Sequence, residues 1–233
     1  MNKIEETEIY GFKAAVRGMR NSMNSWDKSD SRYSCLCMDD KRDCPVEPYI
    51  VGPNDLTFMK KLSKAGTDHS KFLRFITVTA DITAPLYWWK EYDTYKVGTV
   101  ANSCSTMHKI AAKKFTLKDF SHEKLISDSS ECFHEDILSG PESVQTPLDI
   151  LKTKIDTLNV CRKKFLETKD KKYWWQIIQL LPSSYNQKRT VMLNYQVLKN
   201  IYHARKNHKL DCWIEFCRWC ETLPYFKEVC IDD

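Results

Sequence analysis

The sequence predicts a single α/β domain, because stretches with helical and with strand periodicity alternate along its 233 residues. Hydrophobic residues make up 42% of the chain and aromatic residues 12%, which are values typical of a globular protein. A chain of this length also buries a sizeable core. We therefore expect one domain over residues 1–233.

The first clear helix is expected after Pro53-Asn54-Asp55, which is typical of a turn followed by a helix cap. Leu56, Met59 and Leu62 then recur at helical spacing and predict the buried face. Gly66 is the expected end of this helix.

A short helix is expected before His69, and a strand is expected over residues 72–82. Within that strand, hydroxyl and apolar β-branched residues alternate from Ile76 to Thr79, which predicts one buried and one exposed face. Thr83-Ala84-Pro85 is the expected end of the strand.

Residues 86–95 are expected to form a helix with aromatic side chains at nearly every other position. These rings have the contact area to stack on a ligand ring, or they pack in the core or between subunits. We favour packing.

The pattern loosens between residues 109 and 147, and we expect a variable cysteine-containing loop near 33–50 and a loose segment near 121–147. Helical periodicity returns at residue 148, where Leu151, Ile155 and Leu158 share one face. Another helix is expected to begin near Tyr173.

Composition argues against several classes of protein. The formal net charge is +5, but basic and acidic residues are interleaved along most of the chain, so no basic arm stands out. The sequence has no run of roughly 18 apolar residues that would span a membrane, and its charged start lacks a signal-peptide core. We expect a cytoplasmic protein whose ten cysteines are mostly reduced.

Two groups of cysteines have spacings related to metal sites: Cys35, Cys37 and Cys44, and Cys212, Cys217 and Cys220. The first group lacks an obvious fourth ligand. The second group lies in an amphipathic stretch, where small buried thiols are a simpler explanation. We predict no metal site.

The most informative segment lies late in the chain. If the residues from Val191 on are helical, eleven residues bring Arg205 back to nearly the angular position of Asn194, with Leu198 and Ile201 on the stripe between them. A buried Arg needs acceptors for its donors, so this arrangement favours a polar ligand. The alternative is that Asn194 caps the helix and Arg205 extends into water from its last turn.

This segment resembles the C-terminal part of the flavin-dependent thymidylate synthases, the ThyX family. Members carry a Leu-Pro pair, an Asn that opens a helix, a second Asn six residues on and an Arg five beyond. Here these fall on Leu181-Pro182, Asn194, Asn200 and Arg205. A second block agrees as well, in which Ala84-Pro85 follows His69 at the family's distance.

The family's hallmark has the form Arg-His-Arg, then Ser, then Asn-Glu and Ser. Continuing the alignment without gaps places Thr94-Tyr95-Lys96, Thr99, Ala101-Asn102 and Cys104 there. Both arginines are replaced. Lys96 keeps one cation and Thr99 keeps a hydroxyl, but Lys lacks the planar fork that Arg offers to phosphate.

The resemblance implies a thymidylate synthase-complementing-protein-like fold, a mixed sheet flanked by helices. It implies that dUMP is methylated to dTMP, with methylenetetrahydrofolate as carbon donor, reduced FAD as hydride donor and NADPH as reductant. It also implies a homotetramer whose active sites lie between subunits.

By the same resemblance, Arg205 is the expected catalytic residue. The residues expected to bind the cofactor are His69, Asn194, Asn200, Asn102 and Thr99. The residues expected to bind the substrate are Arg189, Lys96, Glu91, Arg20 and Ser22, the last two on an N-terminal strand.

Two alternatives remain open. The first is a family homologue that binds flavin or nucleotide without turnover. The second is a nucleic-acid-binding module that uses the tryptophan-rich stretches, which we disfavour because lysines and aromatic residues are not organised into a known sequence motif.

Overall fold

The computed structural model describes residues 2–34, 49–131 and 145–231. The α-helices are α1 (Phe12–Arg20), α2 (Pro53–Lys64), α3 (Leu86–Tyr92), α4 (Pro147–Thr168), α5 (Lys171–Leu180), α6 (Tyr195–Arg205) and α7 (Asp211–Glu221). The strands are β1 (Lys3–Tyr10), β2 (Arg32–Tyr33), β3 (Tyr49–Ile50), β4 (Thr77–Pro85), β5 (Val100–Ser103) and β6 (Asn186–Asn194). A 3₁₀ helix, η3 (Ser70–Phe75), and a π-helical turn, η7 (Lys227–Ile231), are also used below.

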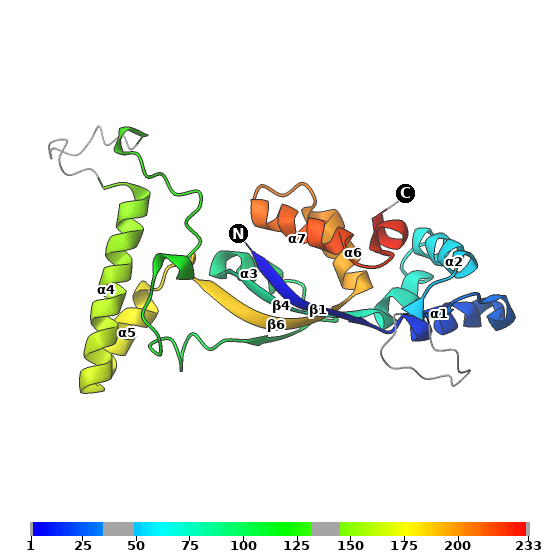
Figure 1. The fold of residues 1–233 in the computed structure, drawn as a ribbon, viewed down its shortest axis with the longest axis horizontal. Coiled ribbons are helices and arrows are strands. Elements are labelled where there is room, and N and C mark those ends of the chain that lie inside the picture. The colour runs from blue at the N-terminus through cyan, green and yellow to red at the C-terminus, as the bar shows by residue number, and fades with distance from the viewer. Residues whose placement is uncertain (1, 35–48, 132–144, 232–233) are drawn as a thin grey trace. The chain divides into compact units, whose positions relative to one another are not determined.

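Four strands form a sheet in the order β1-β4-β6-β5, and β2 pairs antiparallel with β3. With the helices around it, this sheet confirms the predicted α/β class (Figure 1). The chain divides into two compact units, and β4 and β6 each continue from one unit into the other. Unit 1 comprises residues 1–3, 82–93 and 102–189, and unit 2 comprises residues 4–81, 94–101 and 190–233.

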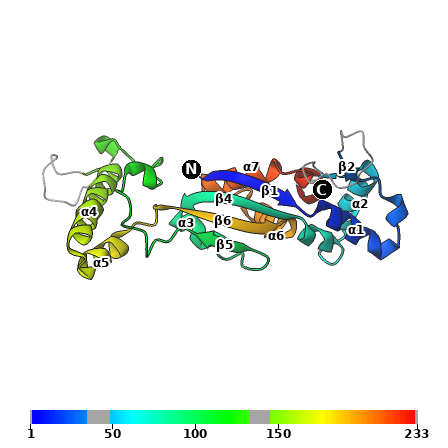
Figure 2. The same cartoon turned by 60° about the horizontal axis from the view of Figure 1, so that its bottom comes forward.

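In unit 1, α4 and α5 pack together as a helical pair (Figure 2). Leu151, Ile155 and Leu158 are buried, which confirms the face predicted for this helix. Ile177 of α5 joins them in an apolar cluster that also takes in Phe115 and other residues of the irregular segment after β5. Burial of these apolar side chains is the main stabilising contribution to the pair.

Helix α3 uses its aromatic residues for packing, as favoured from the sequence. Trp88, Trp89 and Tyr92 are buried and contact one another, with ring centroids 4.9–5.2 Å apart. The indole N–H of Trp89 donates to the backbone carbonyl of Gln187 on β6. The helix ends at Tyr92, three residues earlier than predicted.

In unit 2, α6 and α7 pack against each other on one face of the strands (Figures 1 and 2). Tyr195, the first residue of α6, is fully buried and donates through its hydroxyl to the carbonyl of Pro224. Its ring contacts Phe12 of α1 and Phe226 edge to face. These contacts place the start of α6, which is the element that carries the candidate site.

The strand predicted over residues 72–82 is shifted along the chain. Its alternation is confirmed, because Val78, Ala80, Ile82 and Ala84 of β4 are buried. However, the short helix predicted before His69 follows it instead, as η3. Phe72 therefore lies in a 3₁₀ turn, and β4 extends through Pro85.

Three other local predictions were wrong in whole or in part. Residues 191–194 belong to β6, and the following helix begins at Tyr195. The predicted face of α2 is confirmed at Met59, which is fully buried, but Asp55 and Ser63 share that face in place of Leu56 and Leu62, which are partly buried. Asp55 is buried because it pairs with the buried Arg20. Arg20 and Ser22 do not lie on an N-terminal strand as the resemblance implied: the N-terminal strand is β1, whereas Arg20 ends α1 and Ser22 lies in the 3₁₀ turn that follows.

The variable segments predicted near 33–50 and 121–147 lie partly outside the described residues. Cys35, Cys37 and Cys44 lie outside them entirely. Among the described residues, no helix is long and apolar enough to cross a membrane.

Candidate functional site

Arg205 is the last residue of α6, and its guanidinium is held by aromatic side chains of unit 2. Its Nε donates to the Tyr95 hydroxyl at 3.0 Å. The guanidinium carbon lies 4.8 Å from the ring centroid of Trp213 on α7, which is fully buried. A cation over an indole face is attracted by the ring's negative face. These contacts fix the direction of the half-buried Arg205 side chain.

Asn194 lies at the other end of α6 and caps it. Its Oδ1 accepts from the backbone N–H of Val197 at 3.0 Å. This confirms the cap that the alternative interpretation expected, whereas Arg205 does not extend into water as that interpretation also expected. The backbone of Gly98 comes so close that an added Cβ would lie 2.9 Å from Asn194 Nδ2. Gly98 also has a φ of +76°, which L-residues rarely adopt.

Residues 94–99 thus fold against α6 and contact both of its ends. Tyr95 holds Arg205, Gly98 contacts Asn194, and Thr99 donates its hydroxyl to the carbonyl of Tyr95 at 2.7 Å. We call this set the Arg205 cluster: Tyr95, Gly98, Thr99, Asn194, Arg205 and Trp213. The stretch that aligns with the family hallmark therefore lies beside the C-terminal motif.

A second polar group lies on another side of α6. The Ser70 hydroxyl donates to Gln196 Oε1 at 3.1 Å, and Gln196 Nε2 donates to Asn200 Oδ1 at 3.1 Å. His69 precedes Ser70 and is exposed, as is Asn200. Six residues separate Asn194 from Asn200, so the two amides point about a third of a turn apart. The expected cofactor residues of α6 thus fall into two groups.

In unit 1, Arg189 is surrounded by partners. Its Nη1 lies 2.7 Å from Asp93 Oδ1, and its Nε donates to Gln187 Oε1 at 3.0 Å. The guanidinium also lies 4.2 Å from the ring centroid of Trp89. Its side chain is 15% exposed, so an incoming anion would compete with Asp93 for it.

Arg20 serves the interior of unit 2. Its Nε lies 2.8 Å from Asp55 Oδ1, and both side chains are buried. Burial alone would raise the pKa of Asp55, but hydrogen bonds from Ser29, Ser31 and Arg20, with the Arg20 charge, hold that pKa below its usual value. The structure thus commits Arg20 to an internal ion pair. Ser22 is exposed and donates to the carbonyl of Met19.

The remaining predicted residues lie at the surface or partly buried. Lys96 and Asn102 are exposed, the latter on β5, and Glu91 is partly buried on α3. The six cysteines in the described part of the chain are free thiols, and Cys212, Cys217 and Cys220 are buried. Burial raises the pKa of Cys217 to about 11, although the nearby Arg205 charge opposes the shift.

Several residues of the site were missed by the sequence analysis. Tyr95 aligns with the His of the family hallmark but was given no role, and Trp213 gave no separate signal because it is one aromatic residue in an aromatic-rich stretch. Gly98 carried a usable signal, since a lone glycine between a helix and a strand indicates a tight turn. Gln196, which links Ser70 to Asn200, gave no signal of its own because it lies within a stretch that was interpreted only by its helical periodicity.

Comparison with known proteins shows the fold. No protein-family model matches the chain, and no curated protein sequence matches it. Among solved structures, thymidylate synthase X from Helicobacter pylori with FAD and dUMP aligns with a TM-score of 0.65 and 14% identity, over 100% of this chain and 98% of that chain. A flavin-dependent thymidylate synthase ThyX from the same organism, complexed with FAD and dUMP, aligns at 0.64 and 14%, over 99% and 98%.

A third solved structure extends this group. The UMP/dUMP methylase PolB from Streptomyces cacaoi, bound with 5-Br dUMP, aligns with a TM-score of 0.57 and 10% identity, over 98% of this chain and 94% of that chain. The chain therefore has the fold of these proteins along its whole length, as the resemblance in its sequence implied.

Proposed function

We propose that this protein is a flavin-dependent thymidylate synthase-like enzyme of the cytoplasm, which methylates dUMP to dTMP. Methylenetetrahydrofolate is the carbon donor, and FAD reduced by NADPH supplies the hydride. The observation that carries this proposal is the full-length fold match to proteins whose structures hold FAD and dUMP, or a brominated dUMP. The Arg205 cluster supports it, because it brings the stretch that aligns with the family hallmark against the C-terminal block in which the resemblance lies.

The described residues fit a flavin. Its ring has a polar edge of carbonyl and N–H groups, which amides and cations complement. Asn194 and Asn200 offer amides on α6, His69 is an exposed imidazole, and the glycine at position 98 lets backbone come close to Asn194. When bound, the flavin supplies hydride transfer. We propose that His69, Asn194, Asn200, Asn102 and Thr99 hold it.

Arg205 is the proposed catalytic residue. The Tyr95 hydroxyl and the Trp213 ring orient its guanidinium before any ligand arrives. A preoriented guanidinium beside the uracil ring stabilises the negative charge that develops as the ring becomes nucleophilic. Because the orienting groups are already in place, no reorganisation is needed during the reaction.

For the substrate, we propose Lys96, Arg189 and Glu91 as contacts, with Lys96 meeting the phosphate. Lys96 is exposed in the same loop as Tyr95, so its ammonium is available to an anion. Arg20 forms a buried ion pair with Asp55, which favours a structural role for this residue. Ser22 is exposed and is therefore the more accessible of the two to a ligand. The two differently directed groups on α6 are compatible with sites shared between subunits, and we propose a homotetramer.

One observation favours a second candidate function, the binding of flavin or nucleotide without turnover. The position that aligns with the hallmark's His is Tyr95, and its hydroxyl is engaged with Arg205. Because Tyr95 holds the Arg205 side chain in place, the guanidinium contacts the pyrimidine ring only if the bound ligand comes close to it. If the ligand binds farther away, the protein binds it without turnover.

The test is thymidylate formation from dUMP with methylenetetrahydrofolate, FAD and NADPH. Replacing Arg205 by Ala or by Lys should lower the rate about 100- to 1,000-fold, because one preoriented donor of developing charge is worth about that much. Arg218→Ala is the matched control, since Arg218 is exposed on α7, and its rate should be unchanged. Unchanged turnover in Arg205→Ala would remove this residue from the mechanism. Flavin binding without product in the unmodified protein would favour the second candidate.

A further inference from the structure

Unit 1 carries a strongly basic surface formed by residues to which the proposed function assigns no role. We define the basic surface as residues 107–119 and 162–175. Together these segments contain ten Lys or Arg and three acidic residues, a formal charge of +7. The whole chain carries +5, so the remaining residues are slightly acidic. The molecule's positive charge is thus concentrated in these two segments.

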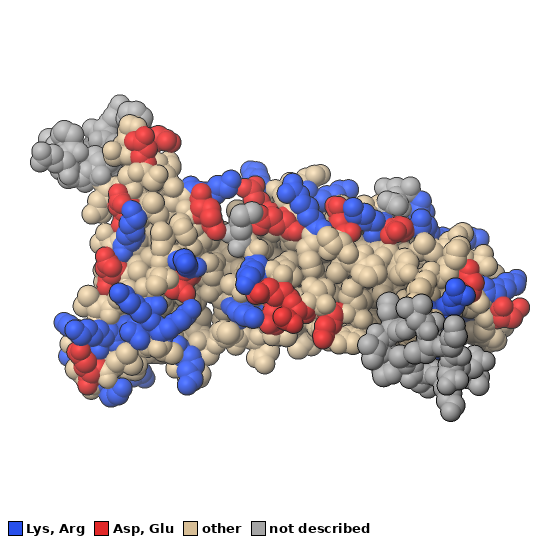
Figure 3. Space-filling model, in the orientation of Figure 1, with Lys and Arg blue, Asp and Glu red and all other residues tan. Residues whose placement is uncertain are grey.

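The fold brings the two segments together, which the linear sequence does not show. Arg162 donates from Nε to the carbonyl of Ala111 at 2.9 Å, and Asn159 exchanges two hydrogen bonds with the backbone of Phe115. Lys and Arg side chains accordingly gather where α4 ends and α5 begins (Figure 3). The lysines at 109, 113, 114, 163, 164, 169, 171 and 172 are all exposed.

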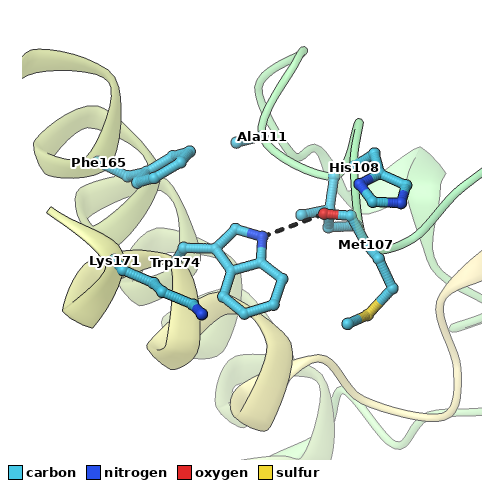
Figure 4. A pocket seen from close by; sticks show the side chains of 7 residues that line it. Met107, His108, Ala111, Phe165, Lys171 and Trp174 are labelled. Atoms are coloured by element: carbon cyan, nitrogen blue, oxygen red, sulfur yellow. Dashed lines mark hydrogen bonds between the residues drawn. The ribbon is translucent and has the colours of Figure 1, made fainter. Parts of the chain in front are cut away.

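Aromatic side chains lie among these cations. Trp174 borders a hollow of about 260 Å³, with Phe165, Met107 and Lys171 also in its lining (Figure 4). The Trp174 indole N–H donates to the carbonyl of Met107 at 3.1 Å, which fixes the ring's position. Trp175, beside it on α5, is 44% exposed, so part of its ring is open to solvent.

The cations and rings are within reach of one another. Lys171 Nζ lies 5.9 Å from the Trp174 ring centroid and 5.7 Å from that of Trp175. Lys164 Nζ lies 5.5 Å from the ring of Tyr173. A ligand that stacks on one of these rings therefore places any attached phosphate beside an ammonium group.

We propose that the basic surface binds single-stranded nucleic acid, with phosphates on the lysines and unpaired bases on Trp174 and Trp175. Single strands are bound by a positive surface that follows the backbone together with aromatic rings on which bases stack. The many lysines spread over two segments exceed what one nucleotide needs. A membrane surface fits less well, because Trp174 lies at a hollow, and its N–H is used internally.

Fluorescence anisotropy with a labelled 12-residue oligo(dT), and with oligo(U) of equal length, tests this proposal. We expect binding that weakens steeply as salt rises from 50 to 200 mM, by a logarithmic slope of about 0.7 for each phosphate contacted. Trp175→Ala should weaken binding about 5- to 150-fold, the range for loss of one stacked base. Trp175 is partly exposed, so this variant is expected to fold, and circular dichroism checks that it does.

Charge reversal provides the matched comparison. Lys164→Glu with Lys171→Glu should weaken binding and reduce the salt slope by roughly 1.4 or more. Lys61→Glu with Lys64→Glu makes the same charge change on exposed residues of α2, in the other unit, and should leave affinity within about twofold. Comparison of oligo(dT) with oligo(U) distinguishes a preference for DNA from a preference for RNA, and binding of either supports the proposal.

Three results would overturn the proposal: no binding of either strand at 50 mM salt, equal affinity for a 12-base-pair duplex, or equal weakening by the α2 control. Sedimentation with phosphatidylserine-containing vesicles, in the absence of oligonucleotide binding, would assign the surface to membranes instead. None of these results depends on thymidylate formation, so the two proposals fail or stand separately.

Discussion

Replacement of Gly98 by Ala tests the contact on which the Arg205 cluster depends. Gly98 has a φ of +76°, and a Cβ there would lie 2.9 Å from Asn194 Nδ2 and 3.3 Å from Val197 Cγ2. An L-residue in a left-handed conformation costs about 1–2 kcal/mol. Asn194 must also move, and because its side chain caps α6, losing the cap costs about 1 kcal/mol more. We expect a total loss of roughly 2–3 kcal/mol in the free energy of unfolding.

Gly66→Ala is the matched control. Gly66 also has a positive φ, +103°, but nothing lies within 4 Å of an added Cβ. This variant should lose only the backbone contribution, about 1–2 kcal/mol. Urea unfolding followed by circular dichroism measures both. The reasoning would be refuted if Gly98→Ala were no more destabilising than Gly66→Ala, because residues 94–99 would then not be packed on the cap of α6.

Further predictions concern the interior of unit 2 and the thiols. Arg20→Met should destabilise the protein by about 3–5 kcal/mol, because it leaves the Asp55 carboxylate buried without its cation, and urea unfolding measures the loss. The hydrogen bonds hold the folded-state pKa of Asp55 below its usual value. Its stabilisation is therefore complete above about pH 4 and is lost as the pH falls through the folded-state pKa. Asp55→Asn should flatten the acid limb of the stability curve, and an unchanged limb would contradict this assignment. Finally, iodoacetamide at pH 8 should label the exposed Cys104 well before Cys217, whose pKa burial raises to about 11; equal labelling in peptide maps would contradict the packing of α7.

Much of the fold follows from local periodicity. The face of α4 was predicted residue by residue, because 22 helical residues repeat the apolar pattern several times. The alternation in β4 was equally clear. The helix predicted for residues 191–194 was wrong because a short apolar run is compatible with a strand or a helix, and pairing in the sheet decides between them. Asp55 was read as a turn residue, since only tertiary structure shows that a buried arginine faces it.

The candidate site was only partly predictable. The motif on α6 was found from its spacing, and Asn194 does cap the helix. What the spacing could not show is that Tyr95, 110 positions before Arg205, turns its hydroxyl toward it. Nor could it show that Arg189 is already paired with Asp93. Contacts between residues so far apart depend on how the strands are paired, which local patterns do not encode.

If the Arg205 cluster belongs to a site for flavin and nucleotide, both ligands should bind together. The most direct measurement is the visible absorbance spectrum of the protein with FAD, followed by addition of dUMP in the same cuvette. We expect retained flavin whose spectrum shifts when dUMP is added, and a weaker shift in Gly98→Ala than in Gly66→Ala. Failure to retain flavin in the unmodified protein would show that the Arg205 cluster is not part of a flavin site and would leave the chain as a relative in fold only.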